Sequence, residues 1–490
     1  MSLPGKKLSL LDATLLVSGS MIGSGIFIVT AEMSRTLGSS GWVLFAWVLT
    51  GVLTIFAALS YGELAGMMPK VGGQYIYIQR AFGKLSAFVY GWSVFTVIQT
   101  GVIAAVAMAF ANYLGVFVEE LGNGEKGILF TVGTYEVTGG KIVAASMILL
   151  LTWLNSQGVR EGKWVQRIFT FTKVFALFGL ILAGLYFANK YDFFTDNISK
   201  AWDAGKYVTD ESGMQGGWVS ISGWAIATGL GVAMVGSIFS SDAWNNVTYI
   251  AGEIENPARN IPRSLLFGTV IVTVIYVLAN VAYISLLPLR GGNYPDLVAQ
   301  GISHASNNRV GAAAANVVMG RGGEFLMAAL IMVSTFGCNN GLILSGSRLY
   351  KAMADDGYFF KKAAILNKHN VPGNALWIQA FWASMLCFSG SYGQLLDYCT
   401  FANLLFYILT IAGIFVLRKK EPNTPRPYKT FGYPVVPILY IILAGFIAVD
   451  IFWFKYVPAL LGIGIVLLGI PVYYLISKNN SENNPEILEK

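Results

Sequence analysis

The run Gly19-Ser20-Met21-Ile22-Gly23-Ser24-Gly25-Ile26-Phe27 lies inside the first hydrophobic segment of the chain. The surrounding apolar stretch, residues 10–37, is long enough to cross a bilayer as a helix. Glycine costs about 1 kcal/mol at an interior helix site relative to alanine, so the small residues in this run predict an interruption. Broken helices at membrane depth are tolerated where protein or a wet cavity satisfies the freed backbone groups. The alternative is close helix packing through small residues.

The composition of the whole chain indicates a membrane protein. Of its 490 residues, 55% are hydrophobic and 12% are charged, and the mean hydropathy is +0.59. These values exclude a soluble globular protein. Apolar stretches predict about twelve helical spans, and β-barrel alternation is absent, so we expect an all-α polytopic bundle. The spans start near Leu10, Gly41, Leu85, Val143, Trp164, Gly223, Ser264, Phe325, Ala375, Gln394, Val435 and Tyr456.

The basic residues predict how these spans are oriented. With the N-terminus inside, two thirds of the 33 Lys and Arg residues fall in cytoplasmic segments, which fits the positive-inside rule. An even number of spans returns the C-terminus to the inside, so both termini are expected to be cytoplasmic, in a plasma or inner membrane. The net charge of +7 reports this topology rather than nucleic-acid binding. Because Asp12 interrupts the first apolar run, a cleaved signal peptide is not expected.

A second interruption is predicted in the sixth span. Residues 237–246 read Ser-Ile-Phe-Ser-Ser-Asp-Ala-Trp-Asn-Asn, which is expensive as a lipid-facing helix. Ser, Asp and Asn also compete with the helical ladder by local hydrogen bonding, so we expect unwinding over 237–242. Freed carbonyls there favour an ammonium group, whereas freed N–H groups at the first break favour a carboxylate. The two breaks together match the two ends of an amino-acid zwitterion.

Breaks in spans one and six suggest two five-helix repeats, because paired interrupted segments mark the central site of many transporters. The expected units are residues 1–190, residues 191–420, and a remainder at 421–490 that holds two spans and a tail. Both breaks could instead be packing kinks. The candidate binding residues are Ser20, Ile22, Gly23, Ser24 and Gly25 in the first break and Phe239, Ser240, Ser241 and Asp242 in the second.

Lys173 is the most unusual single residue, because it lies roughly 13 Å into the fifth span. Intramembrane charges are functional candidates that face the bundle interior. Its ammonium could occupy the place where other carriers hold sodium and so tie span five to spans one and eight. It could also carry a proton if burial lowers its pKa, or it could snorkel to the inner headgroups.

Other residues carry weaker signals. The ring of Phe239 could close over a substrate, although aromatic core filling is the commoner role. Asn340 and Asn403 could join the substrate or the Lys173 network, or they could bond helix to helix. Cys338, Cys387 and Cys399 are read as buried free thiols. His304 and His369 stand alone in loops, so neither a metal site nor a cofactor is predicted.

Several motifs in order along the chain resemble the amino acid–polyamine–organocation superfamily, and within it the L-type amino-acid transporter family. They are Met21-Ile22-Gly23-Ser24-Gly25-Ile26-Phe27, Tyr61-Gly62-Glu63-Leu64, Pro69-x-x-Gly72-Gly73-x-Tyr75, Phe239-Ser240-Ser241-Asp242-Ala243-Trp244-Asn245, the run from Glu253 to Arg263, Ser345-Gly346-Ser347-Arg348-Leu349 and Arg426-Pro427-Tyr428-Lys429. Together they are specific, whereas the first motif alone marks only the superfamily.

The resemblance implies a twelve-helix carrier with an inverted repeat that works by alternating access. It assigns the carboxylate to the backbone of Ile22–Gly25 and the amine to Phe239–Asp242, with Phe239 as the gate. Lys173 matches a lysine associated with sodium independence. Ser241 and Ala243 depart from the aromatic residue and glycine more usual there, which leaves side-chain selectivity open.

The resemblance also bears on partners. Eukaryotic relatives join a glycoprotein through a cysteine between spans three and four, but residues 119–142 contain no cysteine. No disulfide-linked heavy subunit is therefore expected. The sequence predicts a sodium-independent exchanger of neutral L-amino acids. The alternatives are a proton-coupled permease for amino acids or polyamines, and a sensor that binds amino acids without transport. An enzyme is not expected, because nucleotide-loop, zinc-protease and hydrolase-elbow motifs do not occur.

Overall fold

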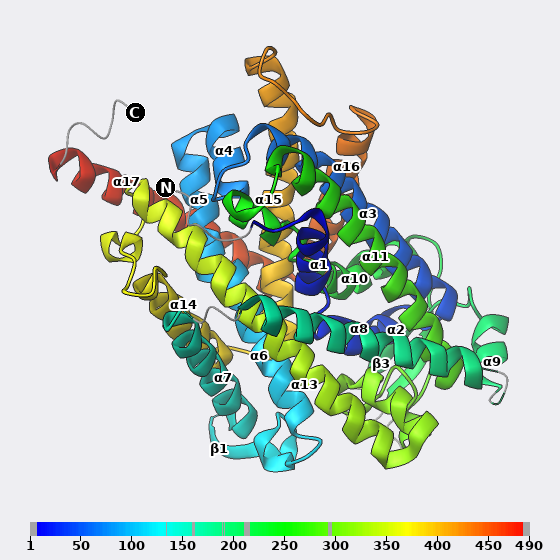
Figure 1. Ribbon diagram of the computed structural model, residues 1–490. Coiled ribbons are helices and arrows are strands. Elements are labelled where there is room, and N and C mark those ends of the chain that lie inside the picture. Colours follow the sequence, from blue (N-terminus) through cyan, green and yellow to red (C-terminus); the bar gives the residue numbers. More distant parts are fainter. Residues whose placement is uncertain are drawn as a thin grey trace.

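The computed structural model describes residues 7–133, 135–158, 162–188, 190, 192–209, 216–292 and 296–483. Helices dominate the structure (Figure 1). The α-helices are α1 (Leu10–Met21), α2 (Thr30–Leu37), α3 (Ser40–Met67), α4 (Gln74–Phe82), α5 (Lys84–Ser93), α6 (Gln99–Leu114), α7 (Gly139–Ser156), α8 (Gly162–Phe187), α9 (Phe193–Ser199), α10 (Trp224–Ser240), α11 (Pro257–Leu286), α12 (Leu297–Gln300), α13 (Val310–Asp355), α14 (Gly373–Cys387), α15 (Tyr392–Lys420), α16 (Val435–Phe454) and α17 (Tyr456–Asn483). The shorter elements are the 3-10 helices η1 (Gly25–Phe27), η3 (Glu119–Leu121), η4 (Glu125–Gly127), η5 (Trp244–Glu253), η6 (Ser306–Asn308) and η7 (Lys361–Ala364), and the π-helical segment η2 (Val94–Ile98).

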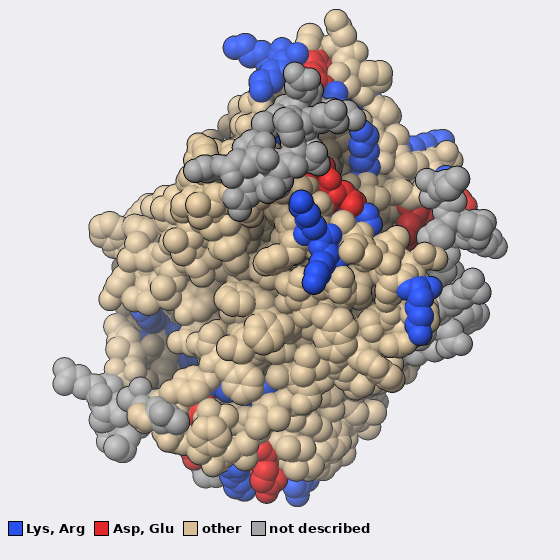
Figure 2. Space-filling view, turned by 90° about the vertical axis from the view of Figure 1, so that its left-hand side faces the viewer, with Lys and Arg blue, Asp and Glu red and all other residues tan. Residues whose placement is uncertain are grey.

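The lengths and compositions of these helices indicate a multi-pass membrane protein. In the described part of the chain, nine helices are long and apolar enough to cross a membrane. Two further apolar helical stretches, Leu10–Met21 and Phe171–Phe187, are shorter. On the face shown in Figure 2, most charged side chains lie toward the upper and lower ends, and several Lys and Arg side chains also lie near the middle of the view. The count of about twelve spans remains a prediction.

Two small β-hairpins depart from the all-α expectation. Strands β1 (Ile128–Val132) and β2 (Tyr135–Thr138) pair antiparallel, as do β3 (Gly205–Thr209) and β4 (Gly216–Ser220). With the N-terminus inside, the predicted topology places both hairpins outside, between spans three and four and between spans five and six. The labelled strands β1 and β3 are found toward the lower end of Figure 1. The predicted helical class is confirmed, and the hairpins were not predicted because span hydrophobicity carries no information about short pairings within loops.

The two interrupted helices lie in the centre of the bundle. Helix α1 packs against α8, α11 and α13, and α10 packs against α3, α15 and α16. Asp12, which interrupts the first apolar run, serves as a cap: its carboxylate accepts from the backbone N–H of Ser9, and the Ser9 hydroxyl accepts from the Asp12 N–H. This capping box fixes the start of α1. The capping box thus positions the start of α1, and the helices packed against α1 surround its end.

Candidate functional site

The first span is broken where the glycine-serine run predicts. Helix α1 ends at Met21, and Ile22 adopts extended backbone angles, with φ −73° and ψ 91°. The short 3-10 helix η1 follows, and regular helix resumes at Thr30 in α2. Ser20 is still helical, so the interruption begins after it.

Lys173 binds the end of α1. Its Nζ donates to the carbonyl oxygens of Gly19 at 2.5 Å and Ile22 at 2.9 Å, and the residue is 2% exposed. The last four carbonyls of an α-helix have no partner within the helix, and the negative end of the helix dipole attracts a cation. The Lys173 ammonium thus supplies both a hydrogen-bond donor for these carbonyls and a positive charge at the negative end of the dipole. It points to α1 rather than away from the bundle.

Two other side chains reach the remaining carbonyls of α1. The hydroxyl of Tyr276 on α11 donates to Met21 O at 2.9 Å, and the Cys338 thiol on α13 lies 3.6 Å from Ser20 O. Carbonyls 19 to 22 are therefore each contacted by a side chain from α8, α11 or α13. Lys173 thus joins span five to span one as predicted. Cys338 contacts the same helix end from span eight, and Tyr276 contacts it from α11.

The N–H groups beyond the break are less satisfied. Among the described residues, no hydrogen-bond acceptor is found for the amides of Ser24, Gly25 and Ile26. Gly25 also approaches the second break closely, because a Cβ added to it would lie 2.0 Å from Ser240 Oγ and 3.0 Å from Ser240 Cα. Close packing, the alternative weighed for this glycine, thus occurs here. The amides of Ser24, Gly25 and Ile26 nevertheless remain as donors with the partial positive charge that suits an anion.

The second break begins later than predicted. Helix α10 continues through Ser240, and only Ser241, Asp242 and Ala243 leave helical geometry before η5. Ala243 has a φ of 65°, in the left-handed region. The prediction of unwinding from Ser237 was wrong because its hydroxyl is used elsewhere, donating to Met234 O at 3.1 Å and lying 2.6 Å from the hydroxyl of Thr50.

Tyr276 connects the two breaks. Besides Met21 O, its hydroxyl lies 3.0 Å from Ser240 O, so one phenol contacts the carboxyl-terminal carbonyls of both α1 and α10. Its ring packs edge-on against Trp47 with centroids 5.3 Å apart, which fixes its position. The two interruptions consequently face one another rather than lipid.

Asp242 is held by the tenth predicted span. Tyr407 OH donates to its Oδ1 at 2.5 Å, and Asn403 Nδ2 donates to its Oδ2 at 2.8 Å, both from α15. A cavity of about 20 Å³, the size of a single water molecule, adjoins Asp242 and Ser241. Of the two asparagines considered, Asn403 therefore joins the second break.

Asn340 serves a different contact. Its Oδ1 accepts from Asn155 Nδ2 at 2.8 Å, which links α13 to α7. This is the helix-to-helix alternative, and the structure does not bring Asn340 to the Lys173 network.

Phe239 lies on the last turn of α10 and is 8% exposed. Its ring meets the ring of Tyr392 edge-on, with centroids 6.1 Å apart. Tyr392, at the start of α15, also lies close to the hydroxyl of Ser24. The aromatic pair thus sits between the two breaks, a position suited to a gate.

Sequence reasoning missed the contribution of α11. Tyr276 reaches Met21 O, Asn280 accepts from the Thr30 hydroxyl at 2.8 Å, and Tyr283 donates to Ile26 O at 3.2 Å. The spacing of these three residues, i, i+4 and i+7, places them on one helix face. Three polar side chains at helical period in an apolar span were the signal that could have revealed them.

Comparisons with known proteins identify the family of this chain. The sequence pattern described as "Amino acid permease" matches residues 8–476. The human large neutral amino acids transporter small subunit 2 is 31% identical over 96% of this chain and 80% of its own length. The mouse Asc-type amino acid transporter 1 and the mouse b(0,+)-type amino acid transporter 1 are each 28% identical over 96% of this chain, and over 81% and 88% of their own lengths. The chain therefore belongs to the amino acid permease family, among the L-type amino-acid transporters.

Proposed function

We propose that this chain is a sodium-independent transporter that exchanges neutral L-amino acids by alternating access. Relatives named as transporters of large neutral amino acids support the substrate class. The single observation that carries the proposal is the meeting of the two breaks at Tyr276, with free amides on one side and carbonyls on the other. An amino-acid zwitterion has the complementary pair of charges.

In this proposal the backbone of Ile22, Gly23, Ser24 and Gly25 binds the carboxylate, with Ser20 at the edge of the site. Carbonyls from Phe239 to Asp242 bind the ammonium. Phe239 gates the site from the side of α10. Lys173 supplies the fixed cation at the end of α1, which removes the need for a sodium ion there; its two short bonds to carbonyl oxygens support this role.

The proposed architecture has twelve spans, with five-helix repeats at 1–190 and 191–420, a remainder at 421–490, and both termini in the cytoplasm. The matching interruptions of α1 and α10 support the repeats. We also propose that no heavy subunit is attached by a disulfide. The sequence has three cysteines, Cys338, Cys387 and Cys399, and all of them are buried.

Exchange is tested with purified protein in proteoliposomes. Uptake of labelled leucine should require unlabelled neutral amino acid inside the vesicles and should be unchanged when sodium is replaced by choline. A competition panel of all twenty amino acids then defines the substrate. Equal uptake into empty and preloaded vesicles would contradict exchange, and binding without uptake would favour a sensor.

One observation favours a second candidate, a proton-coupled permease. Asp242 is a half-buried carboxylate beside the second break, held by Tyr407 and Asn403. A pH step into empty vesicles tests this alternative directly. If an inward proton gradient drives uptake and Asp242→Asn abolishes that uptake, coupling replaces exchange. If the gradient has no effect in the wild type, proton coupling is excluded.

A further inference from the structure

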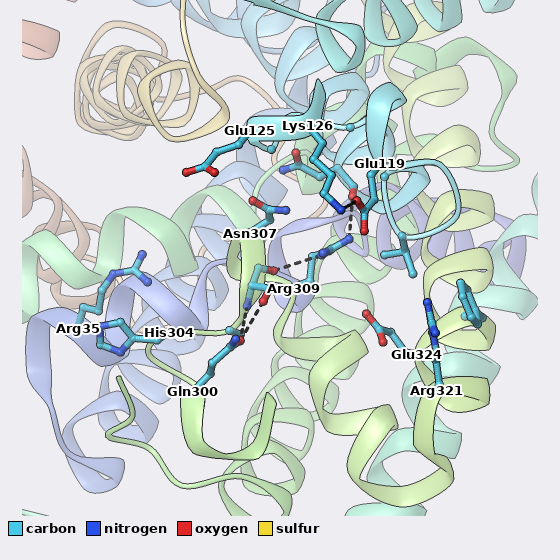
Figure 3. A pocket seen from close by; sticks show the side chains of 18 residues that line it. Arg35, Glu119, Glu125, Lys126, Gln300, His304, Asn307, Arg309, Arg321 and Glu324 are labelled. Atoms are coloured by element: carbon cyan, nitrogen blue, oxygen red, sulfur yellow. Dashed lines mark hydrogen bonds and ion pairs between the residues drawn. The ribbon is translucent and has the colours of Figure 1, made fainter. Parts of the chain in front are cut away.

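A large charged pocket lies away from the two helix breaks, at the end of the molecule that we propose faces outside. Its volume is about 770 Å³, within the range of small-molecule sites. Its lining comes from segments far apart in sequence: the end of α2, the end of α6, the loop holding η3 and η4, the segment 300–309, and α13 after its turn at Gly320. Figure 3 shows their charged side chains converging.

The arginines of this pocket are not held in short ion pairs. Within the described residues, the guanidinium groups of Arg35, Arg309 and Arg321 have no carboxylate at ion-pair distance. Arg309 donates only to backbone carbonyls, those of Ser306 at 3.2 Å and Asn112 at 3.5 Å. Arg321 lies over the ring of Phe325, 5.6 Å from its centre.

Negative charge is present in the same pocket. Glu324 accepts only a long bond of 3.3 Å from Asn316, and in Figure 3 its carboxylate lies between Arg309 and Arg321. Glu119 is already paired with Lys126. Burial and the neighbouring Arg35 lower the pKa of His304, so the imidazole adds no charge at neutral pH. Among the described residues, the charged groups without an ion pair therefore include the guanidiniums of Arg309 and Arg321, with the carboxylate of Glu324 between them in Figure 3.

Three arginines at the opposite end of the molecule are each paired with a glutamate instead. Glu63 binds Arg418 at 2.6 Å, Arg80 binds Glu421 at 2.8 Å, and Arg348 binds Glu253 at 2.8 Å. A recess in which opposite charges stay apart is suited to a ligand that itself carries both signs, because charged groups form the strongest hydrogen bonds.

The pocket is also connected to the first break. Arg309 directly precedes α13 and bonds to Asn112 O. The next residue, Tyr113, donates to Phe27 O at 3.0 Å. A ligand on Arg309 is thus linked to Phe27, in the 3-10 helix η1 of the first break, through Asn112 and Tyr113.

We propose that this pocket is a second, outer binding site for an α-amino acid, which holds the substrate before it enters between the helix breaks. The guanidiniums of Arg309 and Arg321 bind its carboxylate, and Glu324 binds its ammonium. This inference rests on the proposed function for the identity of the ligand.

The test is the double variant Arg321→Gln/Glu324→Gln, which leaves the net charge unchanged. Its matched control is Lys206→Gln/Glu136→Gln, which alters exposed residues of β3 and β2 that do not line the pocket. Exchange of labelled leucine, or of the amino acid that ranks first in the panel, is measured at each membrane face in vesicles of known sidedness. The half-saturating concentration at the pocket face should rise about fivefold, as expected for partly exposed charges, and that at the other face should not change.

A rise in the half-saturating concentration at both faces overturns the outer site, because it indicates damage to the shared site between the helix breaks. No rise at either face also overturns it, because it indicates that the pocket binds no substrate. Equilibrium dialysis of the purified protein with labelled leucine gives an independent result. The wild type and the control should show two dissociation constants, and in the double variant one of them should rise about fivefold while the other stays the same. Two unchanged dissociation constants in the double variant overturn the pocket even if exchange is absent, whereas absent exchange alone overturns only the proposed function.

Discussion

The ends of α1 and α10 are two solutions to the same problem. Both helices stop inside the bundle and leave carbonyl groups without helical partners. At α1, side chains contact all four carbonyls, and one of those side chains is the cation Lys173. At α10, the neutral hydroxyl of Tyr276 contacts Ser240 O, and among the described residues no donor reaches the carbonyls of Ser241 and Asp242.

We call the end of α1 the closed end, because side chains contact its carbonyls, and the end of α10 the open end, because the carbonyls of Ser241 and Asp242 have no donor among the described residues. The carbonyls of α1 are already occupied, so the binding capacity of the first break lies in its free amides. The carbonyls of the second break remain available to an ammonium. One interruption is thus prepared for an acid group and the other for an amine, although both arise from small and polar residues in an apolar span.

The largest expected effect is at the closed end. Lys173→Ala removes two charge-assisted hydrogen bonds, each worth about 1.5 kcal/mol or more, so the rate of leucine exchange should fall about a hundredfold. Lys173→Arg retains the charge and should keep part of the activity. Both are compared with Lys206→Ala on the exposed strand β3, with monodispersity in detergent as the measure of folding. Wild-type exchange by Lys173→Ala would show that the closed end needs no cation.

Separating the two ends should be the next most damaging change. Gly25→Ala places a methyl group 2.0 Å from Ser240 Oγ, and overpacking costs about 1–3 kcal/mol, so exchange should fall tenfold or more. The matched control is Gly179→Ala in α8, where an added Cβ meets nothing within 4 Å. The initial rate of exchange is measured for both. Equal activity of the two variants would mean that the close approach of the breaks is unimportant.

Tyr276→Phe tests the link between the ends. It keeps the ring against Trp47 and removes the hydroxyl that contacts both helices, so the half-saturating leucine concentration should rise about tenfold. Tyr283→Phe, on the same helix, removes a bond to the first span alone and should have a smaller effect. If the two variants behave alike, contact with both breaks has no special role.

The smallest effect concerns the open end. Asn403→Ala removes one of the two donors that hold Asp242, and a single hydrogen bond contributes about 1 kcal/mol, so half-saturation should rise about fivefold. Asn340→Ala removes a bond of equal length between α13 and α7 and should leave half-saturation unchanged. A larger rise for Asn340→Ala than for Asn403→Ala would reverse the assignment of these residues.

Much of this protein could be predicted from its residues in order. The helical membrane class, both interruptions, the inward-facing position of Lys173 and the family motifs are local properties of composition and spacing. The start of the second break could not be predicted, because the hydroxyl of Ser237 contacts that of Thr50, a residue distant in sequence. The hairpins β1–β2 and β3–β4 were missed for a related reason, since short loop pairings leave no hydrophobic period.

By itself the sequence determined that the chain crosses the membrane as helices and that two of those helices are broken, because clusters of glycine, serine and aspartate weaken the interior of a helix. Tertiary structure alone decided what each broken end meets. The partners of Met21 and Ser240 come from α11, those of Gly19 and Ile22 from α8, and that of Asp242 from α15. A hydrogen bond needs two groups within about 3 Å of each other, and that proximity is created by packing between segments rather than by their order.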